Sequence, residues 1–153
     1  NLLPSTVATL FNSKENIVGL KEATGNMAQA SETMYLTDGK LDLYSGEDAL
    51  VLPLLSIGGS GVISVWNNIA PRQVHDLCES FWKGDLATAQ KLQREAIPLV
   101  NALFSEVNPI PVKEAMNLLG MEVGPVRSPL CEMSEANKAK LAEALVNYGF
   151  QLA

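Results

Sequence analysis

The sequence predicts an α/β fold in which three parallel strands alternate with helices and an all-helical region follows. Two observations support this prediction. Strand patterns occupy residues 16–21, 41–44 and 62–66, and the first of them is an apolar run without polar alternation, as is typical of a strand covered on both faces. Segments with helical spacing of apolar residues separate these runs, and no strand pattern follows residue 66. Because such alternation implies right-handed βαβ units, we expect one parallel sheet.

The helices are predicted from apolar spacing and from their end signals. Pro4 suits the first turn of a helix, Ser134 is expected to cap the last helix, and Gly149 is expected to close it. Residues 108–111, which contain two prolines, are expected to form a stiff extended loop. The predicted helices are 4–14, 27–36, 49–57, 71–83, 86–104, 112–119 and 135–148.

Chain length argues against a complete barrel. The 153 residues suit one ordinary domain, whereas a (β/α)8 barrel needs at least roughly 200. Three parallel strands alone would expose apolar edges, and the first residue, Asn1, is not methionine. We therefore interpret the chain as the C-terminal part of a (β/α)8 TIM barrel. Residues 1–70 would form the C-terminal half of the barrel, and 71–153 the last barrel helix and a helical C-terminal region.

Composition disfavours several classes of protein. Eleven scattered Lys and Arg residues against seventeen acids, a net charge of -6, disfavour a nucleic-acid surface. Residues 49–71 carry no charge, but proline and glycine interrupt them, so we expect a buried helix, turn and strand rather than a membrane span. Cys78 and Cys131 lack metal-site spacing, and His75, the only histidine, is interpreted as a surface or boundary residue. The acidic pI near 4.7 fits a cytoplasmic location.

The expected site lies at the C-terminal ends of the strands, where functional groups gather in parallel α/β folds. Lys21 closes an apolar strand, and partial burial of its amine would lower its pKa. A neutral amine can form a Schiff base with a ketone. A solvated lysine at a strand end is the alternative interpretation. Ser45-Gly46 precedes a helix and could hold a carboxylate, although ordinary helix capping is the better explanation of this pair taken alone.

Two further patterns indicate structure rather than chemistry. The glycine-rich run 58–61 leaves a helix and opens a strand, whereas a dinucleotide-binding fingerprint leaves a strand and opens a helix. Glu47 and Asp48 are adjacent at a predicted helix start, where acidic residues usually serve the helix dipole. We therefore expect neither a nucleotide site nor a catalytic carboxylate pair here.

Four segments together resemble the dihydrodipicolinate synthase family, in the same order and at similar spacing. The strings Lys-Glu-Ala-Thr-Gly-Asn at 21–26 and Asn-Pro-Ile-Pro-Val-Lys at 108–113 favour this family over N-acetylneuraminate lyases and sugar-acid aldolases. The resemblance covers nearly the whole chain. The four matching segments are 16–26, 44–48, 58–65 and 108–113.

The resemblance implies a (β/α)8 barrel, usually tetrameric, in which the three strands here are the sixth to eighth. It implies a Schiff-base lyase that condenses pyruvate with L-aspartate 4-semialdehyde to 4-hydroxy-tetrahydrodipicolinate, in lysine and diaminopimelate biosynthesis. Lys21 matches the lysine that forms the imine with pyruvate. Ile63 matches a position that contacts pyruvate through its backbone, and Gly46 matches one that lines the same pocket. No metal and no organic cofactor are implied.

The resemblance also implies that part of the machinery is absent from this chain. The family's proton-relay tyrosines, threonine pair and second-substrate arginine lie in the N-terminal half and have no matching position here. We therefore expect the missing N-terminal half of the barrel as a partner, and no turnover from residues 1–153 alone. Two alternatives stay open: a non-catalytic half-barrel used in assembly, and a sibling pyruvate-dependent aldolase such as N-acetylneuraminate lyase.

Overall fold

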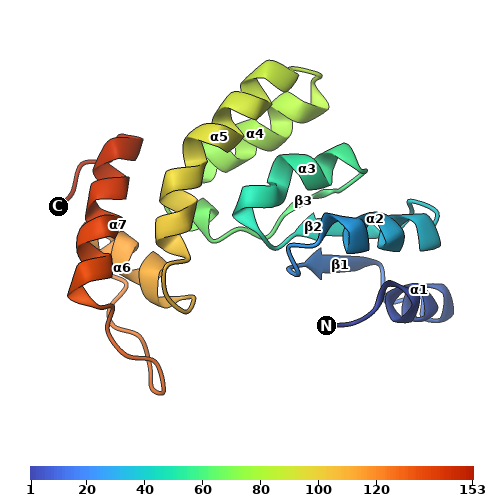
Figure 1. Ribbon diagram of the computed structural model, residues 1–153, viewed down its shortest axis with the longest axis horizontal. Coiled ribbons are helices and arrows are strands. Elements are labelled where there is room, and N and C mark those ends of the chain that lie inside the picture. Colours follow the sequence, from blue (N-terminus) through green and yellow to red (C-terminus); the bar gives the residue numbers. More distant parts are fainter.

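The computed structural model describes residues 1–153 and contains a three-stranded parallel sheet with the predicted α/β connections (Figure 1). The strands are ordered β1-β2-β3, so β1 and β3 are the outer strands. The elements up to the third strand are α1 (Pro4–Ser13), β1 (Gly19–Glu22), α2 (Met27–Leu36), β2 (Asp42–Ser45), the 3-10 helix η1 (Asp48–Leu50), α3 (Val51–Ser56) and β3 (Gly61–Val62).

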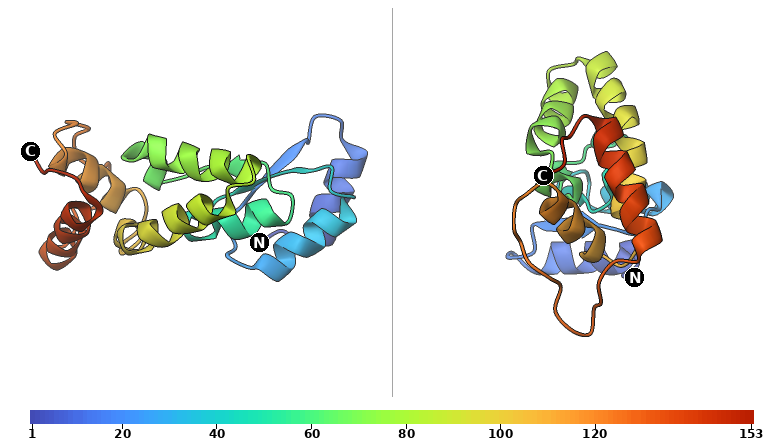
Figure 2. Two further views of the ribbon diagram at one scale, coloured as in Figure 1. Left: turned by 90° about the horizontal axis from the view of Figure 1, so that it is seen from above. Right: turned by 90° about the vertical axis from the view of Figure 1, so that its left-hand side faces the viewer.

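Only helices follow β3. Figures 1 and 2 show α6 and α7 at one end of the molecule, with α1 and β1 at the other. No helix is both long enough and apolar enough to cross a lipid bilayer. These later elements are the 3-10 helix η2 (Trp66–Asn68), α4 (Pro71–Trp82), α5 (Leu86–Leu103), α6 (Ile110–Leu118) and α7 (Glu135–Tyr148).

The third strand is shorter than predicted. Only Gly61 and Val62 belong to β3, whereas the apolar run predicted a strand over 62–66. The reason is Asp48, whose Oδ2 accepts the N–H groups of Val65 at 3.0 Å and Trp66 at 2.8 Å. These contacts hold the chain after Ile63 in a turn that leads into η2. Asp48 also opens η1, and the predicted helix over 49–57 is divided between η1 and α3.

Two predictions about the helical region were wrong. Ile110 and Pro111 form the first turn of α6 instead of an extended loop. A helix start tolerates proline because the first N–H groups of a helix have no partner within it. Ser134 precedes α7 but does not cap it, because its hydroxyl donates to Oε1 of Glu106 at 2.7 Å. The prediction for Gly149 is confirmed, since it closes α7 with a φ of 105°.

Two apolar clusters hold the fold together. The smaller one joins Leu43 of β2 to Ala30 and Met34 of α2 and to Leu54 of α3. The larger one has 18 buried residues, drawn mainly from α4, α5 and α6, with Leu141 and Leu145 of α7 among the rest. Each fully buried leucine in it contributes about 1.5–3 kcal/mol. The fully buried Trp66 belongs to this cluster, so η2 anchors the helical region at the end of the sheet.

The two faces of the sheet differ. Leu20 and Leu43 point toward the helices and pack in the smaller cluster. Alternation along the strands places Lys21, Asp42 and Tyr44 on the opposite side, which we call the open face. Lys21 and Asp42 are exposed there, and Tyr44 is half-buried. The residue expected to carry the chemistry therefore points away from the packed helices.

Candidate active site

Lys21 lies one residue before the end of β1 and is aligned with the neighbouring strands. It pairs with Tyr44 of β2, which in turn pairs with Gly61 of β3. The three residues thus form a row across the open face. The ring of Tyr44 lies near Gly61, where a methyl group would be 3.6 Å from Cδ1 of the tyrosine. A methyl group at Gly61 would thus be in ordinary van der Waals contact with the Tyr44 ring.

Gly46 lies directly against the stem of Lys21. The N–H of Gly46 donates to the carbonyl oxygen of Glu22 at 2.6 Å, which continues the β1–β2 ladder past Ser45. A methyl group at Gly46 would be 2.9 Å from Cε of Lys21 and 2.8 Å from Cβ of Ala23. The family resemblance implies that Lys21 and Gly46 share one site, and the structure places them in contact range.

Ile63 lies beside Gly46 at the same edge of the sheet. Its N–H donates to the carbonyl oxygen of Ser45 at 2.8 Å, so the chain stays paired one residue beyond β3. Its side chain is 49% exposed. The structure therefore brings Lys21, Gly46 and Ile63 together at the C-terminal ends of three adjacent strands.

Asp48 has a structural role that the sequence analysis missed. Its side chain is only 1% exposed, and Oδ2 accepts the two N–H groups that follow the third strand. We expected it to serve a helix dipole together with Glu47, but only Glu47 does so, by accepting the N–H of Ala49 at 3.4 Å. The residue type alone could not reveal this, because Asp48 bonds to groups 17 and 18 residues away.

The loop after Lys21 is held by side chains that contact the backbone. Oε1 of the buried Glu22 accepts the N–H of Thr24 at 2.6 Å, and Oγ1 of Thr24 accepts the N–H of Asn26 at 3.1 Å. Oδ1 of Asn26 caps α2 by accepting the N–H groups of Ala28 and Gln29. Glu22 alternates with Lys21 along β1, so its carboxylate lies on the other face of the strand.

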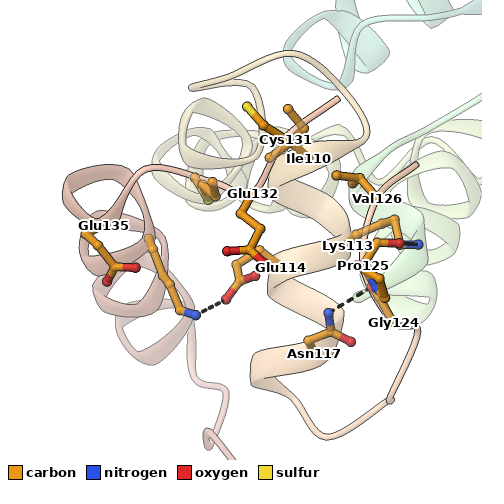
Figure 3. A pocket seen from close by; sticks show the side chains of 12 residues that line it. Ile110, Lys113, Glu114, Asn117, Gly124, Pro125, Val126, Cys131, Glu132 and Glu135 are labelled. Atoms are coloured by element: carbon orange, nitrogen blue, oxygen red, sulfur yellow. Dashed lines mark hydrogen bonds and ion pairs between the residues drawn. The ribbon is translucent and has the colours of Figure 1, made fainter. Parts of the chain in front are cut away.

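Neither of the two cavities described here encloses Lys21, Gly46 and Ile63 together. Lys21 borders a cavity of about 220 Å³ between α1, α2 and β1, which neither Gly46 nor Ile63 lines. A cavity of about 320 Å³ lies far along the chain, between α6, residues 124–133 and α7 (Figure 3). Two of its charged pairs are engaged with the protein itself, since Glu114 contacts Lys138 at 2.6 Å and Lys113 donates to the carbonyl of Pro125 at 2.7 Å. The candidate site is therefore an open surface.

The remaining reactive residues lie elsewhere. His75 is exposed on α4, as predicted, and its ring contacts Asp76 at 3.1 Å. Cys78 is buried, and its burial raises the pKa of the thiol, while Cys131 is exposed at the second cavity. No group of three or more His, Cys, Asp or Glu side chains comes together as a metal site.

A parallel βα array whose candidate site lies at the C-terminal ends of its strands is typical of α/β proteins, (β/α)8 barrels among them. The model of the dihydrodipicolinate synthetase family matches residues 1–148. The chain belongs to this family.

Similarity to individual proteins extends over almost the whole chain. The 4-hydroxy-tetrahydrodipicolinate synthase of Lachnoclostridium phytofermentans is 54% identical over 149 residues, which are 97% of this chain and 51% of that protein. That of Clostridium tetani is 46% identical over 148 residues, 97% of this chain and 50% of that protein. The chain thus spans about half the length of the curated relatives it matches.

Solved structures agree with this result. The dihydrodipicolinate synthase of Thermotoga maritima has a TM-score of 0.93 and 39% identity, over 97% of this chain and 52% of that one. The enzyme of Aquifex aeolicus has a TM-score of 0.93 and 41% identity, over 98% of this chain and 51% of that one. These likenesses confirm the barrel-type α/β fold. The position of the chain within its longer relatives stays a prediction.

Proposed function

We propose that this chain carries the imine-forming part of a 4-hydroxy-tetrahydrodipicolinate synthase, a pyruvate-dependent lyase of lysine and diaminopimelate biosynthesis. The observation that carries the proposal is the placement of Lys21 on the open face, at the C-terminal end of β1 and against Gly46. Membership of the family supports the reaction class. A cytoplasmic location, expected from the pI near 4.7, is part of the same proposal.

In the proposed reaction, the amine of Lys21 attacks the ketone carbon of pyruvate and water leaves, which gives an imine. The protonated imine draws electrons from the pyruvate methyl group, which loses a proton and becomes an enamine. The enamine carbon then attacks the aldehyde of L-aspartate 4-semialdehyde. The amino group that came with the aldehyde substrate then attacks the imine carbon and displaces the lysine nitrogen, which closes the ring and restores the free amine. The lysine side chain itself thus supplies the electron sink.

We assign supporting roles to Gly46 and Ile63. Gly46 would line the pyruvate pocket beside the lysine stem. The N–H of Ile63 is already donated to Ser45, so any backbone contact of Ile63 with pyruvate comes from its carbonyl oxygen. The proton transfers also require an acid or base near the imine.

We infer that the chain corresponds to the C-terminal half of its relatives. Residues 1–70 would be the last strands of the barrel with their helices, and 71–153 the last barrel helix with the helical C-terminal region. The strands of an eight-stranded barrel follow one another along the chain, and no strand follows Val62. The partners in this proposal are the rest of the barrel and, for the whole enzyme, further subunits of a tetramer. Residues 1–153 alone would then lack turnover.

Borohydride trapping tests the proposed function. The full-length protein that contains these residues is incubated with pyruvate, reduced, and weighed by intact-mass spectrometry, with Lys21→Ala as the control. We expect a reduced pyruvyl adduct that Lys21→Ala abolishes. A half-barrel used only in assembly would give no adduct. A sibling aldolase would give the adduct but would not consume L-aspartate 4-semialdehyde.

A further inference from the structure

We propose that Gly46 is a positioning residue for Lys21, and that the lack of a side chain at Gly46 sets the path of the lysine stem. The inference rests on the proposed function, because it concerns the placement of the amine that forms the imine. It assigns to Gly46 a role distinct from lining the pyruvate pocket.

The contacts around Gly46 leave only one movable neighbour. A methyl group there would lie 2.9 Å from Cε of Lys21, 2.8 Å from Cβ of Ala23 and 3.0 Å from the carbonyl oxygen of Glu22. Non-bonded carbon atoms prefer about 3.5–4.0 Å, so all three distances are too short. The Glu22 oxygen already accepts the N–H of Gly46, and Cβ of Ala23 is fixed to the backbone. The flexible stem of Lys21 would therefore give way first.

Backbone conformation does not account for a glycine at this position. Eight glycines of the chain have a positive φ, among them Gly25 and Gly61, but Gly46 does not. Its conformation is one that alanine adopts without strain. Glycine is needed at residue 46 for space, and the substitution Gly46→Ala isolates the steric effect on the lysine.

Displacement of the amine and loss of a substrate contact have different kinetic signatures. If Gly46 only lined the pocket, a methyl group would weaken pyruvate binding and leave the maximal rate of imine formation unchanged. If Gly46 positions Lys21, the methyl group of Gly46→Ala misaligns the amine with the bound pyruvate, and the maximal rate falls. A misplacement of about 1 Å can cost about 100-fold in rate.

The test measures the rate of borohydride-trapped adduct against pyruvate concentration in the full-length protein. We expect Gly46→Ala to lower the maximal rate by about tenfold to a hundredfold. The matched control is Gly19→Ala on β1, whose methyl group would meet the carbonyl oxygen of Asp42 at 2.8 Å and has no atom of Lys21 among its nearest neighbours. We expect its maximal rate to stay close to that of the parent, because none of the atoms that this methyl group would meet belongs to Lys21.

A double variant distinguishes the effect of crowding Lys21 from the effect of crowding Ala23. Gly46→Ala combined with Ala23→Gly removes the 2.8 Å contact and keeps the 2.9 Å contact with Lys21. It also relieves strain if the single variant folds poorly, which a thermal melt of each protein reports. We expect the double variant to keep the loss in maximal rate.

Three results would overturn the inference. The first is an unchanged maximal rate in Gly46→Ala, and the second is recovery of the rate in the double variant. The third is a parent protein that traps no pyruvate, which would refute the proposed function and the inference with it. Trapping by the parent together with either of the first two results refutes the positioning role alone.

Discussion

The side chain of Gln93 on α5 bonds the carbonyl oxygen of Asp48, with Nε2 and that oxygen 2.9 Å apart. Its Oε1 accepts the N–H of Leu52 at 3.0 Å. Asp48 in turn holds the N–H groups of Val65 and Trp66. The helical region therefore contacts the backbone just beyond Gly46 and Ile63, so a residue of α5 helps to place the edge of the sheet that carries the candidate site.

Gln93→Ala is expected to destabilise the fold. The substitution leaves the N–H of Leu52 and the carbonyl of Asp48 without their partner in a buried region, and each unsatisfied group costs about 1–3 kcal/mol. The free energy of unfolding, measured by denaturant titration, checks this. Gln90→Ala on the exposed side of α5 is the matched control, with an expected change within about 0.5 kcal/mol. Equal stabilities of the two variants would contradict the prediction.

The stabilising effect of Asp48 is expected to depend on its acceptor oxygen, Oδ2. Asp48→Ala removes the acceptor for two N–H groups and should cost about 1–3 kcal/mol, with faster hydrogen exchange at Val65 and Trp66. Asp48→Asn keeps one oxygen for these N–H groups, and its amide would occupy the place of Oδ1, which has no hydrogen-bond partner. We expect the Asn variant to retain most of the stability.

Exposed Asp76 gives the control for Asp48, because Asp76→Ala also removes a carboxylate and touches only His75. Hydrogen exchange at the amides of Val65 and Trp66 in Asp76→Ala should match that of the parent. Unchanged exchange in Asp48→Ala would show that the bonds to Asp48 do not hold this turn.

The sequence predicted the order of elements because apolar spacing and end signals are local. The predicted helix 27–36 coincides with α2, whose cap Asn26 lies in the adjacent turn. It did not predict the early end of β3, because that depends on Asp48, distant in the chain. The candidate site shows the same difference between local and distant determinants. Lys21 and Gly46 were predicted individually, whereas the contact between them depends on the register that pairs Lys21 with Tyr44.

Glu106, in the loop between α5 and α6, binds the start of α7 in a way that depends on pH. Its carboxylate accepts from the hydroxyl of Ser134, the amide of Asn137 and the N–H of Ser134, and these bonds lower the pKa of Glu106. A folded-state pKa below the unfolded value of 4.5 stabilises the fold above that pH. The stabilisation is lost as the pH falls through the lowered pKa.

We therefore expect Glu106→Gln to be less stable than the parent at neutral pH and to approach it in acid. Thermal melts of both proteins from neutral to strongly acidic pH measure the difference. Glu132→Gln, an exposed carboxylate in the same region, is the control and should track the parent at each pH. A difference for Glu106→Gln that stays constant with pH would rule out the ionised carboxylate as its cause.

Tyr148 gives the corresponding prediction at alkaline pH. Burial raises its pKa from 10.0 to about 12, and its ring packs edge-on against Trp66 with the ring centroids 6.2 Å apart. Because the folded state favours the neutral phenol, the stabilisation is complete below the unfolded pKa of 10.0 and is lost as the pH rises toward about 12.

Tyr148→Phe keeps the ring and removes the ionisation, so its stability should fall less steeply across this window. Thermal melts compare it with Tyr35→Phe, whose ring is 81% exposed and which should follow the parent. Identical alkaline slopes for Tyr148→Phe and the parent would show that ionisation of this buried phenol does not limit the fold at high pH.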